Sequence, residues 1–377
     1  VIGLPTLPGN DLQLIDDPGT FFRLLVEDIE RARKTCFLEF YIWEEGGQAD
    51  EVAAAIMRAV DRGVACRVLL DSIGSDTFLQ SDRAAEMKNK GVEIVEALPA
   101  GIFRALFVRI DLRNHRKMAI IDGMVAYTGS QNLVDPLFFK QDEHVGTWID
   151  TMVRVRGPVV EAMTATFFYD WFVESEISQQ ELSDIGDIPE AEVAGDALVQ
   201  LVPSGPGFER GGIHDLLLTT IYTARRELVL TSPYFVPDNA ILSALKSAAL
   251  RGVEVTIIVP RKNDSRLVRY ASRARYSELA RNGVRIMTFS EGLLHAKTIT
   301  VDQEFSLIGS VNLDMRSFWL NFELTLFVYN KEFTQKLRAV QQQYIELAQF
   351  LDPPSFARRS FFARLKENCA LLVGPLL

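Results

Sequence analysis

The sequence predicts an α/β protein made of two similar halves, and three observations support this prediction. Amphipathic helical stretches alternate with short apolar, β-rich runs along the chain. The phrase H-x-K-x4-D-x6-G-S-x-N occurs twice, once from His115 and once from His295. The length of 377 residues suits two domains of about 150 to 200 residues each. We therefore expect two α/β/α sandwich halves, packed as a pseudo-twofold pair with one site shared between them.

The first half is expected to span residues 1–174. A helix at 21–34 and a strand at 35–43 are followed by helix–strand pairs at 50–62 and 64–71 and at 84–89 and 92–96. This alternation predicts helices covering a largely parallel sheet. Residues 118–121 and 125–128 form a predicted β-hairpin around Asp122 and Gly123, and residues 158–174 form a closing helix.

An acidic stretch at 175–197 is expected to link the halves, since no Lys or Arg occurs between Arg156 and Arg210. The second half, 198–352, repeats the pattern with helices expected at 213–226, 239–250 and 265–282. Arg251-Gly252-Val253 matches Arg62-Gly63-Val64, each before an apolar strand. A basic and apolar tail follows at 353–377.

Composition excludes several classes of protein. The net charge of −10, from 40 basic and 50 acidic residues, argues against a nucleic-acid-coating protein. Three cysteines argue against a disulfide framework and fit a reducing compartment. The sequence contains no run of about 20 apolar residues, so it predicts no membrane-spanning helix. Because the chain begins at Val1 and not at Met, we expect an upstream segment.

The repeated phrases contain the groups that a phosphoryl-transfer site needs. Lys117 and Lys297 supply fixed positive charge, and the amides of Asn132 and Asn312 supply hydrogen-bond donors for non-bridging phosphate oxygens. We assign the neighbouring hydroxyls to the same phosphate site, namely those of Ser130 and Ser310. One neutral histidine can attack phosphorus, and the other, when protonated, can supply a proton to the departing alcohol.

Each histidine should be oriented by a carboxylate. Asp142 and Glu143 follow His115 by 27 and 28 residues, and Glu323 follows His295 by 28, so these three are the candidates. Asp122 and Asp302 belong to the catalytic phrases, but at hairpin turns they are expected to bond the backbone and hold each phrase in shape.

A metal site is the competing interpretation of paired histidines and carboxylates. A lysine two residues after each histidine argues against it, because an ammonium group would be repelled by a divalent cation. We therefore expect no metal.

Three segments could contact a membrane. Residues 101–113, with Arg104, Phe107 and Arg109, form either a core-packed helix or an apolar, Arg-flanked lip at a membrane surface. The basic stretch 261–281 is either a solvated helix face or a headgroup-binding rim. The tail, with Phe361 and Phe362, is either docked on the protein or lies in the interface.

The doubled phrase resembles the signature of the phospholipase D superfamily. Further stretches resemble bacterial cardiolipin synthases of the phospholipase D type over almost the whole chain, including Tyr41-Ile42-Trp43, Pro233-Tyr234-Phe235-Val236-Pro237 and residues 312–323. The resemblance implies that one phosphatidylglycerol transfers its phosphatidyl group to His115 with loss of glycerol, and that a second phosphatidylglycerol accepts it. His295 would be the acid and base, and no cofactor would be needed.

The resemblance also implies a place at the bacterial inner membrane, on the cytoplasmic side, at an anionic lipid surface. Family members commonly carry N-terminal membrane helices, so we expect this protein to be peripheral or to be anchored by a segment upstream of Val1. Water or another alcohol as acceptor would make the enzyme a phospholipase D hydrolase or transphosphatidylase, and serine would make it a phosphatidylserine synthase. A nuclease is disfavoured by the acidity, and a non-catalytic lipid-binding scaffold by two intact phrases. The sequence itself does not order the two histidines or identify the acceptor.

Overall fold

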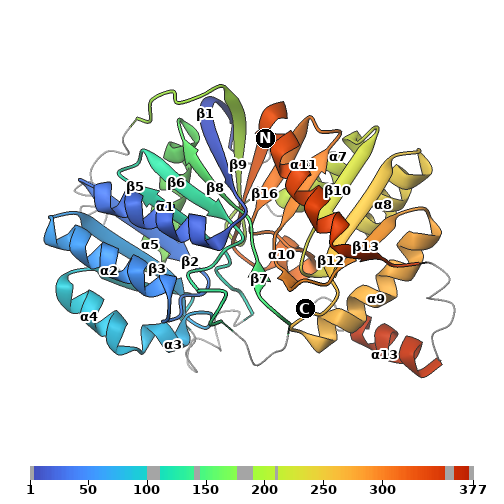
Figure 1. The fold of residues 1–377 in the computed structure, drawn as a ribbon, viewed down its shortest axis with the longest axis horizontal. Helices are drawn as coiled ribbons and strands as arrows, with labels where there is room; N and C mark the ends of the chain where they lie inside the picture. Colours follow the sequence, from blue (N-terminus) through green and yellow to red (C-terminus); the bar gives the residue numbers. More distant parts are fainter. Residues whose placement is uncertain are drawn as a thin grey trace.

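The computed structural model describes residues 4–99, 111–139, 145–175, 190–208, 211–352 and 361–372. The first half has helices on both sides of its strands (Figure 1). Its strands are β1 (Thr6–Ile15), β2 (Thr35–Phe40), β3 (Ala65–Asp71), β4 (Glu93–Ala97), β5 (Met118–Ile121), β6 (Val125–Gly129), β7 (Trp148–Ile149) and β8 (Met152–Arg156). Its helices are α1 (Pro18–Arg31), α2 (Gln48–Asp61), α3 (Asp76–Leu79), α4 (Asp82–Lys90) and α5 (Val159–Glu174).

The second half repeats this arrangement. Its strands are β9 (Ala197–Ser204), β10 (Glu227–Thr231), β11 (Phe235–Val236), β12 (Glu254–Pro260), β13 (Arg285–Phe289), β14 (Leu293–Leu294), β15 (Thr298–Val301), β16 (Phe305–Gly309), β17 (Leu313–Asp314), β18 (Glu323–Tyr329) and β19 (Ala348–Phe350). Its helices are α7 (Gly212–Thr223), α8 (Asn239–Leu250), α9 (Arg266–Arg281), α10 (Met315–Trp319), α11 (Lys331–Glu346) and α13 (Phe361–Leu372). The hairpin of each half and the predicted helices that fall within the described residues are therefore present, with small differences at their ends.

Within the described residues, fifteen strands form one sheet that crosses both halves (Figure 1). From the central pair β1 and β9, one side runs β8-β6-β5-β2-β3-β4 and the other runs β18-β16-β15-β10-β12-β13, with β19 added at the edge. The two orders correspond strand for strand. The predicted α/β fold of two similar halves is confirmed.

The sheet is mixed, so the prediction of a largely parallel sheet was wrong. Parallel pairing is confined to β2-β3-β4 and β10-β12-β13, whereas the hairpins and their neighbours pair antiparallel. Strand β1, which was not predicted, pairs with both β8 and β9. Its Pro8-Gly9-Asn10 sequence resembles a turn, but the structure accommodates it in a register shift between Leu7 and Asn10.

Apolar side chains bury both faces of the sheet. In the first half, Phe21 of α1 and Ile56 of α2 pack with Leu38 and Val68 on one face. On the other face, Phe167 of α5 belongs to a cluster that also contains residues of β9, β18 and α11, among them Val199, Leu326 and Leu337. This cluster joins the two halves, so their relative position is held by core packing as well as by the sheet.

Backbone hydrogen bonds also cross between the halves just before each repeated phrase. The His115 N–H donates to the carbonyl of Phe322, and the Phe322 N–H donates to the carbonyl of Arg113, each at 2.9 Å. On the other side, the His295 N–H donates to the Ile149 carbonyl at 2.7 Å, where β14 runs parallel to β7. Each histidine is thus attached to the opposite half through its own backbone.

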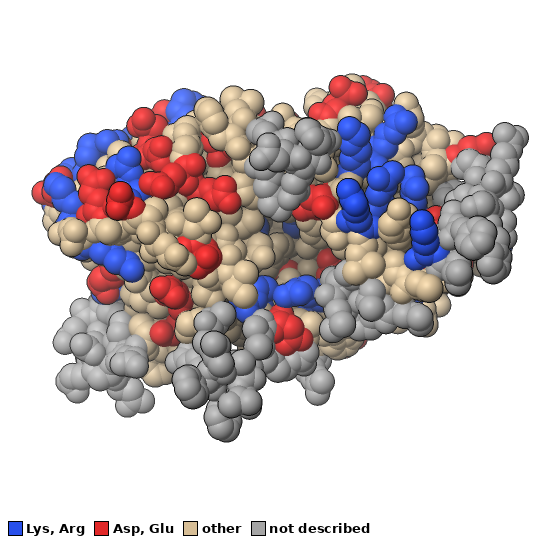
Figure 2. All heavy atoms as spheres, turned by 90° about the horizontal axis from the view of Figure 1, so that it is seen from below, with Lys and Arg blue, Asp and Glu red and all other residues tan. Residues whose placement is uncertain are grey.

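Lys and Arg side chains gather over the second half on the face seen from below (Figure 2). On α9 and the loop before it, the exposed residues include Arg261, Lys262, Arg266, Arg269 and Arg273, with the exposed apolar side chains Leu267 and Tyr270 between them. We call these seven residues the basic face. Within α9 the one acidic residue is Glu278, which pairs with Lys246.

The tail helix α13 packs against α9. Ala370 and Leu371 contact a cluster that contains Val236, Val268 and Ala271, and Ala370 is buried. This part of the tail therefore packs on the body of the protein. Among the described residues, no helix has both the length and the apolar character needed to cross a bilayer.

The two turn aspartates lie at the far ends of the hairpins from the histidines. The Asp122 carboxylate accepts hydrogen bonds from the backbone N–H groups of Arg33, Lys34 and Thr35. Asp302 accepts them from the corresponding residues Arg225, Arg226 and Glu227. Both aspartates have positive φ, near +54°, which Asp tolerates better than most residues. Each one fastens its hairpin to the strand beside it, as the turn interpretation expected.

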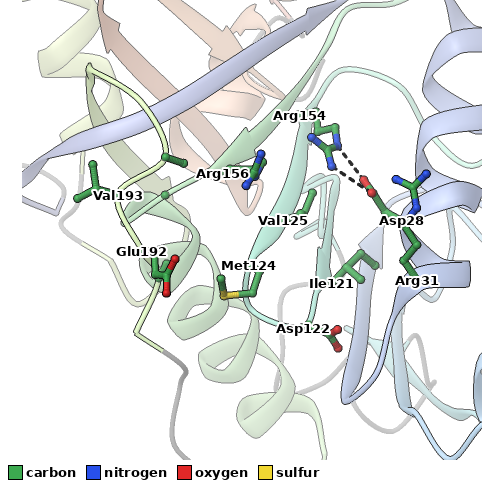
Figure 3. A pocket seen from close by; sticks show the side chains of 13 residues that line it. Asp28, Arg31, Ile121, Asp122, Met124, Val125, Arg154, Arg156, Glu192 and Val193 are labelled. Atoms are coloured by element: carbon green, nitrogen blue, oxygen red, sulfur yellow. Dashed lines mark hydrogen bonds and ion pairs between the residues drawn. The ribbon is translucent and has the colours of Figure 1, made fainter.

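Asp122 and Asp302 therefore do not line the cavity that contains the histidines, although both belong to the phrases that we expected to be catalytic. Figure 3 shows Asp122 beside a cavity of about 320 Å³ at the turn end of the sheet. Arg31 and Arg156 also line this cavity, and Arg154 pairs there with Asp28. The histidines do not line it.

We predict that Asp302→Ala destabilises the protein by about 1.5 to 3 kcal/mol, because three backbone donors lose a charged acceptor. Asp302→Asn should cost less, since Asn keeps one acceptor and tolerates positive φ. Although burial opposes it, hydrogen bonds from Glu227, Arg226 and Arg225 hold the pKa of Asp302 below its ordinary value. Its contribution is therefore present above that ordinary pKa and is lost as pH falls through the lowered one.

Denaturant unfolding of the wild type and both variants checks this prediction. The difference in unfolding free energy between wild type and Asp302→Ala should shrink on acidification. An Asp302→Ala protein as stable as wild type at neutral pH would show that these bonds do not hold the hairpin.

Candidate active site

The two repeated phrases meet at a cavity of about 280 Å³ between the halves. Its wall contains one histidine and one asparagine from each phrase, namely His115, Asn132, His295 and Asn312. The predicted convergence is therefore present in the structure. The wall also contains two arginines, two tyrosines and two aspartates, which are Arg113, Arg316, Tyr41, Tyr234, Asp264 and Asp314.

His115 is oriented by Glu323. Nδ1 of His115 lies 2.8 Å from Oε2 and 3.0 Å from Oε1 of Glu323, and both side chains are buried. A carboxylate can only accept, so Nδ1 carries the hydrogen and Nε2 keeps its lone pair. Glu323 also accepts hydrogen bonds from the Ser310 hydroxyl and the Asn321 amide. The ring is further held by an edge contact with Tyr41.

His295 has an equivalent partner in Asp150. Its Nδ1 lies 2.7 Å from Oδ1 of Asp150, which is also buried, and its ring packs against Trp148. Again the hydrogen is held at Nδ1 and the lone pair is left at Nε2. The two imidazoles therefore have matching tautomers and matching partners.

Each orienting carboxylate comes from the opposite half. Glu323 was predicted from its spacing to His295, but it binds His115. The partner of His295 is Asp150, which was not among the candidates. Asp142 and Glu143, the candidates in the first half, lie outside the described residues.

The strand register explains why spacing misled the prediction. Ser130 N–H donates to the carbonyl of Thr151, and Ser310 N–H donates to that of Leu324, so Asp150 and Glu323 occupy equivalent positions. In the sequence, Asp150 follows Ser130 by 20 positions, whereas Glu323 follows Ser310 by 13. A search for an acid at the start of the strand that pairs with each hairpin, or up to two residues before it, would have found Asp150.

Burial lowers the pKa of both histidines. For His115, burial outweighs the opposing effect of Glu323, and the pKa falls to about 4. For His295, burial and the Lys297 charge together lower the pKa to about 4, against the effect of Asp150. Both rings are therefore neutral near pH 7. A bound phosphate anion would raise both values, because it favours the protonated form.

The two lysines are buried in the same region. Nζ of Lys117 donates to the carbonyl of His115, and Nζ of Lys297 donates to that of His295, each at 2.6 Å. Burial lowers the pKa of Lys117 to about 7 and that of Lys297 to about 8. An anion between the two lysines would favour their protonated forms. Phosphate binding and protonation of the lysines are therefore coupled.

The serines do not occupy the predicted role at the phosphate. The Ser310 hydroxyl donates to Glu323, and the Ser130 hydroxyl accepts from Thr151 N–H. Both serines are buried, and through these bonds each one holds the segment that carries an orienting carboxylate. The glycine before each serine has a related reason: a Cβ on Gly129 would lie 2.3 Å from the Thr151 carbonyl oxygen.

The asparagines lie where the prediction placed them, in the cavity wall. Asn132 Oδ1 accepts from the Ile42 N–H at 3.2 Å, which turns its amide donors away from that backbone. The Oδ1 of Asn312 is buried and has no hydrogen-bond partner among the described residues. A bound ligand or water would satisfy this atom.

Arg116, within the first phrase, supports the site from behind and was not predicted. Its guanidinium is buried and pairs with Asp170 of α5. It also donates to the carbonyls of Glu323 and Ser204 in the second half. Arg116 therefore connects the first phrase to β18, the strand that begins with Glu323, the partner of His115.

The predicted membrane-contacting residues fall in two separate parts of the chain. Arg104, Phe107 and Arg109 lie outside the described residues, and so do the side chains of Phe361 and Phe362. The exposed Arg and apolar residues of the basic face are described, and they lie beside the cavity, because Val268 of α9 is part of its wall.

Comparisons with known proteins agree with this geometry. A family model described as cardiolipin synthase, PLD-like domain, matches residues 25–171 and 217–345, one segment in each half. Cardiolipin synthase A of Serratia proteamaculans is 47% identical over 378 residues, covering 100% of this chain and 77% of the relative. Cardiolipin synthase A of Salmonella arizonae is also 47% identical, over 375 residues, with the same coverage.

Solved structures share the fold. The phosphatidylserine synthase of Haemophilus influenzae Rd KW20 superimposes with a TM-score of 0.71 over 99% of this chain and 97% of its own, at 16% identity. Polyphosphate kinase of Porphyromonas gingivalis superimposes with a TM-score of 0.59 over 91% of this chain and 49% of its own, also at 16% identity. At this low sequence identity, the similarity to these structures supports the fold alone.

The two matched segments, the 47% identity to relatives over the whole of this chain, and the doubled His-Lys phrase at one cavity lead to one conclusion. The chain belongs to the phospholipase D superfamily, in the family of cardiolipin synthases with PLD-like domains.

Proposed function

We propose that this chain is a phosphatidyltransferase that makes cardiolipin from two molecules of phosphatidylglycerol. The observation that carries this proposal is the pair of buried histidines, each with its Nδ1 held by a carboxylate from the opposite half and its Nε2 left with a lone pair. The similarity to cardiolipin synthases, which spans this whole chain and 77% of each relative, supports the choice of substrates.

In the first step, Nε2 of His115 attacks the phosphorus of one phosphatidylglycerol. The bond from phosphorus to the glycerol oxygen breaks, and the glycerol leaves with a proton from His295. Lys117, Lys297 and the asparagine amides stabilise the additional charge on the phosphoryl oxygens. We take the assignment of His115 as nucleophile from the resemblance, since the two histidines have equivalent surroundings.

In the second step, His295 acts as a base. It removes the proton from a hydroxyl of the second phosphatidylglycerol, whose oxygen attacks phosphorus as the bond to His115 breaks. Asp150 stabilises the imidazolium that His295 becomes, and Glu323 keeps His115 in the required tautomer. The products are cardiolipin and the free enzyme.

We further propose that the basic face lies against an anionic membrane, so that the cavity opens toward lipid headgroups. Its arginines attract anionic headgroups, although the net charge of the whole chain is negative. The exposed side chains of Leu267 and Tyr270 supply apolar contact with the lipid. This surface would be the cytoplasmic leaflet of the bacterial inner membrane. The two phospholipase D-like domains, 1–174 and 198–352, would contribute one phrase each, joined by the 175–197 linker.

We predict that His115→Ala and His295→Ala each lower the rate of cardiolipin formation by about a thousandfold or more, because each removes the nucleophile or the acid and base. The measurement is product analysis with phosphatidylglycerol vesicles. The matched control is His214→Gln, since His214 lies outside the cavity wall. Appreciable turnover by either alanine variant would contradict a single site that needs both histidines, and phosphatidic acid as the main wild-type product would favour hydrolysis.

Glu323→Gln and Asp150→Asn should each lower the rate by about a hundredfold to ten-thousandfold, because a neutral amide neither fixes the tautomer nor stabilises the imidazolium. The Glu323 charge raises the pKa of His115 against the effect of burial, so its removal should move the acid limb of the pH profile to lower pH. Rates of cardiolipin formation across pH test both statements. Wild-type rates in both variants would show that these carboxylates have no part in the reaction.

Arg266→Glu with Arg269→Glu should weaken sedimentation with phosphatidylglycerol vesicles by more than tenfold, since each basic residue near an anionic surface contributes about 1 kcal/mol. The control is the double reversal of Arg31 and Arg156 to Glu, at the cavity of Figure 3 on the turn side of the sheet. That variant should bind as wild type does. Equal weakening in both variants would assign binding to total charge and not to the basic face.

A further inference from the structure

The cavity contains two arginines that the pseudo-twofold symmetry does not account for. Arg316 lies four residues after Asn312, where the first half has Pro136 after Asn132. Arg113 lies two residues before His115, where the second half has Leu293 before His295. The symmetric residues line the cavity in matching pairs, whereas these two arginines add positive charge without a symmetric counterpart.

Arg316 is held in place without a carboxylate. Its Nη2 donates to the carbonyl of Asp111 at 2.7 Å, and its Nε donates to Oδ1 of Asn321 at 3.3 Å. No ion pair joins it to an acid within the part of the chain that the structure describes, and it is half-buried. Arg113, in contrast, is buried and pairs with Asp71.

The two acids in the cavity wall, Asp264 and Asp314, already have other partners. Asp264 accepts a hydrogen bond from the Tyr234 hydroxyl. Asp314 caps α10 by accepting from the Ser317 N–H, and burial raises its pKa to about 7, which reduces its negative charge. The guanidinium of Arg316 is therefore a cation that can bind an anion in the cavity.

A short chain of hydrogen bonds links this cation to the reacting centre. Arg316 donates to Asn321, Asn321 donates to Glu323 at 3.2 Å, and Glu323 binds Nδ1 of His115. An anion on Arg316 would thus lie close to the phosphate under attack, but outside the cluster of histidines, lysines and asparagines that binds it.

The chemistry of the two substrates says what that anion is. The donor brings one phosphate, which occupies the symmetric centre. A second phosphate enters with an acceptor that is itself a phospholipid, and it is present again in the product. We propose that Arg316, assisted by Arg113, binds the phosphodiester of the acceptor phosphatidylglycerol and so determines that a lipid, and not water or a small alcohol, receives the phosphatidyl group. This inference rests on the proposed function.

The test compares two reactions that share the first step. One is cardiolipin formation, and the other is exchange of labelled free glycerol into phosphatidylglycerol, which needs no second phosphate. Arg316→Gln should lower cardiolipin formation at least tenfold while glycerol exchange changes by less than about twofold, because the charge-assisted contact serves the acceptor alone. Arg316→Lys, which keeps the charge but not the fork, should fall between them.

The matched control is Arg281→Gln, an exposed arginine at the far end of α9 and outside the cavity wall, which should leave both rates unchanged. Equal losses of both reactions in Arg316→Gln would mean that Arg316 only supports the fold, and would overturn the assignment. So would an unchanged ratio with loss of inhibition by inorganic phosphate, which would point to a site for free phosphate. A wild type that exchanges glycerol but forms no cardiolipin would refute the proposed function itself.

Discussion

The exchange of carboxylates between the halves is the interaction on which the site depends. Glu323 holds His115 and Asp150 holds His295, so neither half contains a complete histidine pair. The groups involved are almost entirely buried, and ionised groups are stable there only when they are paired and fully hydrogen-bonded. The surrounding network meets this condition through Ser310, Asn321 and the backbone contacts of Arg116.

The single sheet makes this exchange geometrically reliable. Because β1 pairs with β8 and β9 together, the strands that begin beside Asp150 and Glu323 belong to one hydrogen-bonded structure. The backbone bonds from His115 to Phe322 and from His295 to Ile149 then fix each phrase against the opposite half. Small shifts between the halves would break these bonds and both histidine pairs at once, so we regard the sheet as part of the catalytic apparatus.

Much of this architecture could be predicted from the sequence, because it rests on local patterns. The helices follow apolar periodicity, the β-hairpins follow turn residues, and the doubled phrase reports the duplication directly. The partner of His295 could not be found by spacing, since the segment between Ser130 and Asp150 is longer than its counterpart. The roles of Ser130 and Ser310 could not be predicted either, because the same sequence fits a serine hydroxyl that binds a phosphate and one that binds a nearby carboxylate or backbone group. Strand β1 was obscured by its Pro8-Gly9-Asn10 sequence, which only the pairing with β9 explains.

Proton NMR of the histidine rings in the wild type, Glu323→Gln and Asp150→Asn tests the central claim most directly. Imidazole Nδ1–H protons that donate to buried carboxylates should give two strongly downfield signals in the wild type. Glu323→Gln should shift the signal assigned to His115 and leave that of His295, and Asp150→Asn should do the reverse. If Glu323→Gln instead shifted the His295 signal, the carboxylates would act within their own halves, and the account of a site exchanged between halves would be wrong.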